Sequence, residues 1–65
     1  MLEKIGTNAG KVWQLLDDAG VQNVKDVKKA AKLTDKDLYA ALGWLAREGK
    51  VSFTEQEKDL FVSLA

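Results

Sequence analysis

The stretch Gly49–Ala65 reads GKVSFTEQEKDLFVSLA, and it decides the fold because the spacing of apolar residues changes within it. Apolar side chains take every second position in two runs, Val51 and Phe53 first and then Leu60, Val62 and Leu64. This alternation is typical of strands that bury one face. The polar run between them, residues 55–59, predicts a β-hairpin with a loop of about four or five residues.

Before Gly49 the apolar residues instead follow the period of an α-helix. We expect a first helix that begins at Thr7, a candidate N-cap, and ends at Ala19, because Gly20 follows as a stop signal. The connector over residues 21–24 can form one brief strand. Asn23 in this connector is a candidate cap for the next helix.

A second helix is predicted from about residue 24 to residue 32, and a tight corner at Leu33-Thr34 follows it. The third helix is expected from Asp35 to about Glu48. Thr34 and Asp37 have the spacing of a capping box, with aspartate in place of the usual glutamate or glutamine. The apolar stripe of this third helix consists of Leu38, Ala41, Leu42 and Leu45.

The order of elements predicts the fold class. Two helices joined by a tight corner, the second of which runs into a two-stranded ribbon, form a winged helix-turn-helix. We therefore expect an α+β domain with a three-helix bundle followed by a C-terminal β-hairpin wing. A short strand between the first two helices is an option. A chain of 65 residues is one domain, which spans residues 1–65.

Two stretches also resemble a known family. They are IGTNAGKVW at Ile5–Trp13 and LYAALGWLAREGKV at Leu38–Val51, and the likeness covers nearly the whole chain. Both are similar to a small bacterial family of uncharacterised winged helix-turn-helix domains, a domain of unknown function. The resemblance implies the winged-helix fold and, more loosely, DNA binding. It implies no catalytic residues.

The composition narrows the classes of function. Ten basic and ten acidic residues give a net charge of zero, and the chain has no histidine and no cysteine. Disulfides, thiol chemistry and most zinc sites are thereby excluded, and the serines have no histidine to activate them. We expect a cytoplasmic domain that is not an enzyme, with no cofactor, no metal and no membrane partner. A domain this small buries little apolar surface, and without disulfides or a bound metal to stabilise it a homodimer is favoured.

Two basic surfaces could hold double-stranded DNA. Opposite the apolar stripe of the third helix lies a narrow strip with a cation at each end: Lys36, Ala40, Gly43 and Arg47. This helix enters the major groove in many helix-turn-helix proteins. The second helix carries a face made only of lysine, consisting of Lys25, Lys28, Lys29 and Lys32. Both surfaces can equally be ordinary solvated helix faces.

The predicted wing and the overall charge argue against strong DNA binding. Glu55, Glu57 and Asp59 outnumber Lys58 in the wing, so the loop expected near phosphate is acidic. A neutral chain also lacks the broad positive field of a typical DNA-binding protein. A protein-interaction or dimerisation module on the same scaffold is therefore the alternative function.

Gly43, Trp44 and Phe61 are the candidates for a dimer interface. Glycine inside a helix costs about 1 kcal/mol relative to alanine, so something should offset Gly43. Trp44 and Phe61 both lie off the apolar pattern of their elements, and aromatic residues are enriched at subunit interfaces. Alternatively, a small domain wraps both aromatic side chains into its single core.

Overall fold

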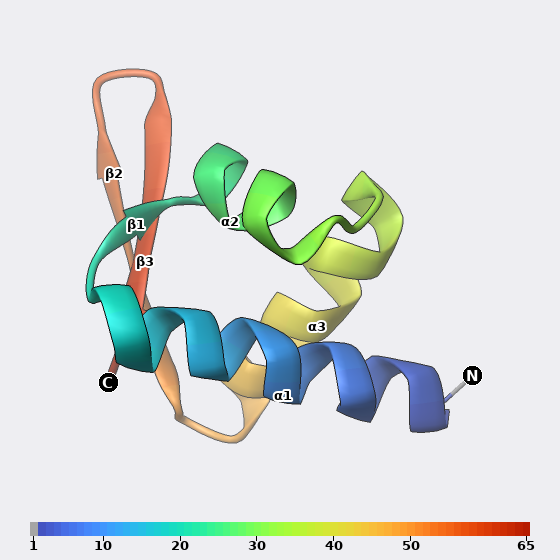
Figure 1. Cartoon of the computed structure of the whole chain (residues 1–65). Coiled ribbons are helices and arrows are strands. Elements are labelled where there is room, and N and C mark those ends of the chain that lie inside the picture. Colours follow the sequence, from blue (N-terminus) through green and yellow to red (C-terminus); the bar gives the residue numbers. More distant parts are fainter. Residues whose placement is uncertain (1) are drawn as a thin grey trace.

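The computed structural model describes residues 2–65, which form three helices and a three-stranded sheet (Figure 1). In chain order the elements are α1 (Leu2–Ala19), β1 (Gln22–Asn23), α2 (Val24–Ala31), α3 (Asp35–Arg47), β2 (Val51–Gln56) and β3 (Asp59–Leu64). This is the predicted α+β winged helix-turn-helix, and the optional strand between the first two helices is present.

Helix α1 begins five residues before the predicted start at Thr7, so the assignment of Thr7 as N-cap was wrong. The extra turn is held by contacts with α3 that the local sequence does not reveal. The Lys4 Nζ lies 3.1 Å from an Asp37 carboxylate oxygen, and Ile5 is half-buried. At the C-terminal end of α1, the predicted stop at Gly20 was correct. Gly20 adopts a φ of 76°, and its N–H donates to the Leu16 carbonyl over 2.8 Å.

The predicted N-caps of α2 and α3 are confirmed. Asn23 caps α2 by accepting a hydrogen bond from the Lys25 N–H at 2.9 Å. The Thr34 hydroxyl caps α3 and accepts from the Asp37 N–H at 3.2 Å. The Asp37 carboxylate faces Lys4 and makes no hydrogen bond back to the cap, so only half of a capping box forms.

The core lies between the three helices and one face of the sheet. It consists of Ala9, Val12, Leu16, Val24, Val27, Leu38, Ala41, Leu42, Leu45, Val51 and Val62. The predicted stripe of α3 is entirely buried, and the buried apolar residues of α1 and α2 also follow helical spacing: Ala9, Val12 and Leu16 in α1, and Val24, Val27 and Ala31 in α2. The periodicity of the sequence therefore identified the core faces of all three helices.

The hairpin is longer and its turn tighter than expected. Strands β2 and β3 pair antiparallel from Val51 opposite Leu64 to Gln56 opposite Asp59, which leaves only Glu57 and Lys58 in the turn. The expected loop of four or five residues was wrong because polar residues can continue the strand pairing where the hairpin is exposed to solvent. Strand β1 pairs with β3, so β2 is an edge strand.

Phe53 does not join the core, although it alternates with Val51. Its partner across the ladder is Val62, which is 1% exposed, whereas Phe53 itself is 41% exposed. Val62 lies on β3, the central strand of the sheet, whereas Phe53 lies on β2 at the edge of the sheet. Alternation in sequence thus predicted a pattern of faces but not which strand lies at the edge.

The hairpin turn offers a test of this geometry. Glu57 has a φ of 58°, a conformation that costs a non-glycine residue roughly 1 kcal/mol or more. Glu57→Gly is expected to raise the free energy of unfolding by about 0.5–1 kcal/mol in a urea titration. Lys58→Gly is the matched control and should lower it, because Lys58 has no positive φ to relieve. Equal effects of the two changes would contradict the turn geometry.

Candidate functional site

The helix-turn-helix unit is built by a left-handed residue at the end of α2. Lys32 has a φ of 57°, and its N–H donates to the Lys29 carbonyl over 3.3 Å. The next N–H, that of Leu33, reaches back to the Lys28 carbonyl over 3.3 Å. Two bonds of this kind end a helix and reverse the chain. As a result, only residues 32–34 separate the end of α2 from the start of α3.

The predicted strip on α3 is accessible along most of its length. Lys36, Gly43 and Arg47 are exposed, while Ala40 is half-buried beside a small hollow that it shares with Lys4 and Ile5 of α1. Among residues 2–65, neither Lys36 nor Arg47 has an acidic partner within ion-pair distance. The strip is therefore a smooth surface with an unneutralised cation at each end.

The lysine face of α2 is divided by neighbouring carboxylates. The Lys28 Nζ lies 2.8 Å from Asp35 at the start of α3, and the Lys25 Nζ lies 3.6 Å from Asp59 at the start of β3. Lys29 and Lys32 are exposed and pair with no acid in the part of the chain that the structure describes. We call Lys29, Lys32, Lys36 and Arg47 the unpaired cations.

The acidic residues of the wing follow the predicted distribution. Glu55 and Glu57 are exposed in the hairpin, and half-buried Asp59 neutralises Lys25. This ion pair joins the wing to the start of α2, and Figure 1 shows both at the same end of the molecule. The wing consequently brings negative charge to the end of the lysine face.

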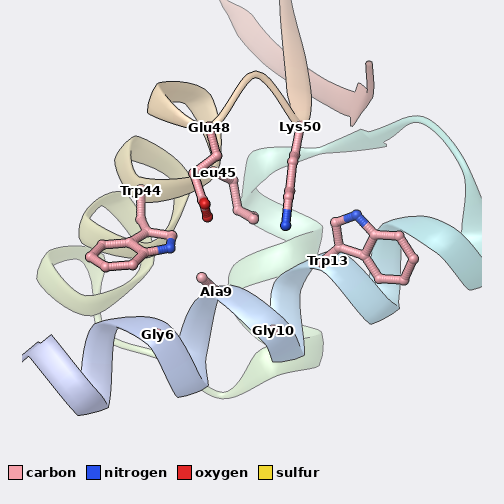
Figure 2. A pocket seen from close by; sticks show the side chains of 8 residues that line it. All are labelled: Gly6, Ala9, Gly10, Trp13, Trp44, Leu45, Glu48 and Lys50. Carbon is pink, nitrogen blue, oxygen red and sulfur yellow. The ribbon is translucent and has the colours of Figure 1, made fainter.

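A groove of about 390 Å³ runs between α1 and α3, and Figure 2 shows it from close by. We call it the α1–α3 groove. Its lining residues are Gly6, Ala9, Gly10, Trp13, Trp44, Leu45, Glu48 and Lys50. Glycine and alanine of α1 form one side, while the two indoles stand at opposite ends, and the charged ends of Glu48 and Lys50 point into the space between them.

The structure separates the three residues predicted for a dimer interface. Gly43 and Trp44 are neighbours on α3, and Trp44 is 39% exposed at the groove, so the alternative that the core absorbs it is wrong. Phe61 lies between Asn23 and Thr54 in the sheet and is half-buried. Successive residues of a strand point to opposite faces, so Phe61 faces away from the core residue Val62.

Sequence reasoning missed most of the groove. Gly6, Gly10 and Trp13 come from α1, whereas Glu48 and Lys50 flank the end of α3. No motif joins these positions, and the early start of α1 was not foreseen. The signal that could have been used is the pair of glycines one turn apart in α1, since glycine is unfavourable inside a helix.

The comparison with protein-family models gives a match over residues 1–64, to a family described as a winged helix-turn-helix domain, DUF2582. The chain belongs to this family. The function of the family is not established, so membership shows the fold and leaves the activity open. That the family is confined to bacteria remains a prediction.

Individual relatives agree with this assignment. The chain is 29% identical over 66 residues to the uncharacterised protein MJ1608 of Methanocaldococcus jannaschii, covering 98% of this chain and 94% of that one. The solution structure of protein BT2368 from Bacteroides thetaiotaomicron is similar at 31% identity and a TM-score of 0.86, over 95% of this chain and 76% of that one.

A third likeness concerns the fold alone. A structure of the DNA recognition and protein interaction domains of HOP2 is similar at 22% identity and a TM-score of 0.74, with 89% of this chain and 98% of that chain covered.

Within residues 2–65, no three metal-ligating side chains gather in one place. No helix in the same range has the length and apolar character needed to cross a bilayer.

Proposed function

We propose that this domain binds double-stranded DNA through its helix-turn-helix, weakly and with little dependence on sequence. The observation that carries the proposal is the set of unpaired cations on α2 and α3: Lys29, Lys32, Lys36 and Arg47. They lie on the two helices that face DNA in helix-turn-helix proteins. We expect a non-catalytic binding module that acts in the cytoplasm, with regulation of transcription as its cellular role.

The geometry suggests how the contacts are divided. Because the middle of the α3 strip is only Ala40 and Gly43, the helix can approach the floor of the major groove closely, and Lys36 and Arg47 can reach phosphates on either side. Lys29 and Lys32 of α2 supply further phosphate contacts. The acidic wing adds repulsion, which keeps affinity low and strongly dependent on salt.

Substitution of the α2 lysines tests this division. Lys29→Gln with Lys32→Gln is expected to lower affinity for a random duplex and to reduce the slope of log K against log salt by about 1.8, since each lost phosphate contact contributes about 0.9. Fluorescence anisotropy at about 50 mM salt gives both quantities, because electrostatic affinity is greatest at low salt.

The matched control is Lys25→Gln with Lys28→Gln, which removes the same charge from the same helix. These two lysines already face Asp59 and Asp35, so the expected loss is smaller. Arg47→Gln should weaken binding independently of both pairs. No binding by the unaltered protein at high micromolar concentration, or equal losses in the two double variants, would contradict the proposal.

A second candidate function is protein interaction. The α1–α3 groove favours it, because an exposed tryptophan beside a hollow of about 390 Å³ is a feature of binding surfaces more than of solvated ones. Zero net charge favours it too, since it gives no long-range attraction to nucleic acid.

A further inference from the structure

We infer that the α1–α3 groove is a self-association surface, in which two copies of this chain pair about a two-fold axis. The Trp44 of each copy covers the groove of the other, and Glu48 of each copy faces Lys50 of its partner. This inference deepens the second candidate function and does not depend on DNA binding.

Three glycines inside helices point to a close approach from outside the chain. A Cβ added at Gly6, Gly10 or Gly43 would meet no atom within 4 Å, so packing inside the domain requires none of them. Glycine is nonetheless the least favourable helix residue except proline. Gly6 and Gly10 line the groove, and Gly43 precedes Trp44. Gly6 and Gly10 thus leave the α1 side of the groove free of side chains, and Gly43 leaves open space beside Trp44 in sequence.

The two tryptophans make this bare surface a binding surface of defined shape. Trp44 is 39% exposed at one end of the groove and half-buried Trp13 stands at the other (Figure 2). The volume of about 390 Å³ is within the range of pockets that take small ligands, roughly 300–1,000 Å³. The groove can therefore accept a ring inserted by a neighbouring molecule.

The charges in the groove select a second copy as the occupant. Glu48 and Lys50 both line it, carry opposite signs, and are joined by no ion pair to each other or to another residue of the described range. A surface with one charge of each sign is complementary to itself after a two-fold rotation, because residue i then contacts residue j and residue j contacts residue i. Zero net charge also removes general repulsion between the copies.

Charge reversal tests the pairing directly. Glu48→Lys alone and Lys50→Glu alone each place like charges opposite one another, and each is expected to weaken self-association at least roughly tenfold in sedimentation equilibrium. The double variant restores both pairs and should associate like the unaltered protein. An equimolar mixture of the two single variants should also associate, because each then supplies the charge that the other needs.

A second pair of variants tests the aromatic contact. Trp44→Ala is expected to leave the protein monomeric, whereas Tyr39→Ala should not change association, because Tyr39 is 55% exposed on α3 but does not line the groove. Circular dichroism on each variant confirms that it remains folded. All of these measurements are made without DNA, so their outcome is independent of the anisotropy experiment.

Two results would overturn the inference. One is that the unaltered protein stays monomeric at all concentrations up to about 1 mM. At that concentration even a dimer with a dissociation constant of about 1 mM would be detected. The other is a dimer that both single charge variants and Trp44→Ala leave intact, which would place the interface elsewhere. Association of the mixed single variants, with neither associating alone, would confirm the two-fold pairing.

Discussion

Leu42→Ala is expected to cause the largest loss of stability of the substitutions considered for this domain. Leu42 is 2% exposed in the middle of α3, and replacement of a buried leucine by alanine costs about 2–5 kcal/mol. Total stability of a domain of this length is roughly 3–10 kcal/mol, so this one substitution removes from about a fifth to all of it. Urea denaturation followed by circular dichroism measures the loss.

The control for this prediction is on the same helix. Tyr39→Ala shortens a side chain that is 55% exposed and should change the free energy of unfolding by less than about 1 kcal/mol. If Leu42→Ala also cost under 1 kcal/mol, α3 would not pack on α1 and the sheet as described. If Leu42→Ala is largely unfolded, as its expected cost allows, a loss of DNA binding or of self-association in this variant carries no information about either surface.

Alanine at Gly6, Gly10 and Gly43 together is expected to stabilise the domain substantially. Each change relieves about 1 kcal/mol of helix propensity without a clash, because the space around each added Cβ is open. The combined gain of about 3 kcal/mol corresponds to a rise in Tm of roughly 12–24 °C for a domain of this size. Thermal denaturation of the triple variant at low concentration measures it.

The glycines outside helix interiors provide the opposite control. Gly20 and Gly49 have φ values of 76° and 69°, so alanine at either position should lower the Tm. An unchanged or lower Tm in the triple variant would mean that its three glycines serve the packing of the domain itself.

The triple variant should also associate more weakly, since the added methyl groups of Gly6→Ala and Gly10→Ala occupy the groove. Stability and association would then change in opposite directions.

Features encoded within a few residues were predictable. The helical stripe of α3, the glycine stops and the caps at Asn23 and Thr34 depend on neighbours within one or two turns, and the structure confirms them. The start of α1 was not predictable in this way. Residues 2–6 are helical, and Lys4 lies opposite Asp37 of α3, a contact between segments far apart in the chain.

The candidate sites show the same division more sharply. The lysine face of α2 and the strip on α3 were visible as spacing, but which cations remain unpaired was not. Lys25 meets Asp59 only because the hairpin folds back beside α2, and Lys28 meets Asp35 across the corner. The aromatic pair was only half visible, since Trp44 was singled out for its position on α3 whereas Trp13 follows the apolar period of the first helix as a core residue would.

The sequence by itself determined the order and type of the elements, because periodicity, caps and stops act through local hydrogen bonds and through the burial of one face. Only the tertiary structure decided the length of α1, the exposure of Phe53, the neutralised lysines and the groove between α1 and α3. These depend on distances between segments remote in sequence. Such distances follow from how the helices and the hairpin pack, and no local pattern of residues specifies them.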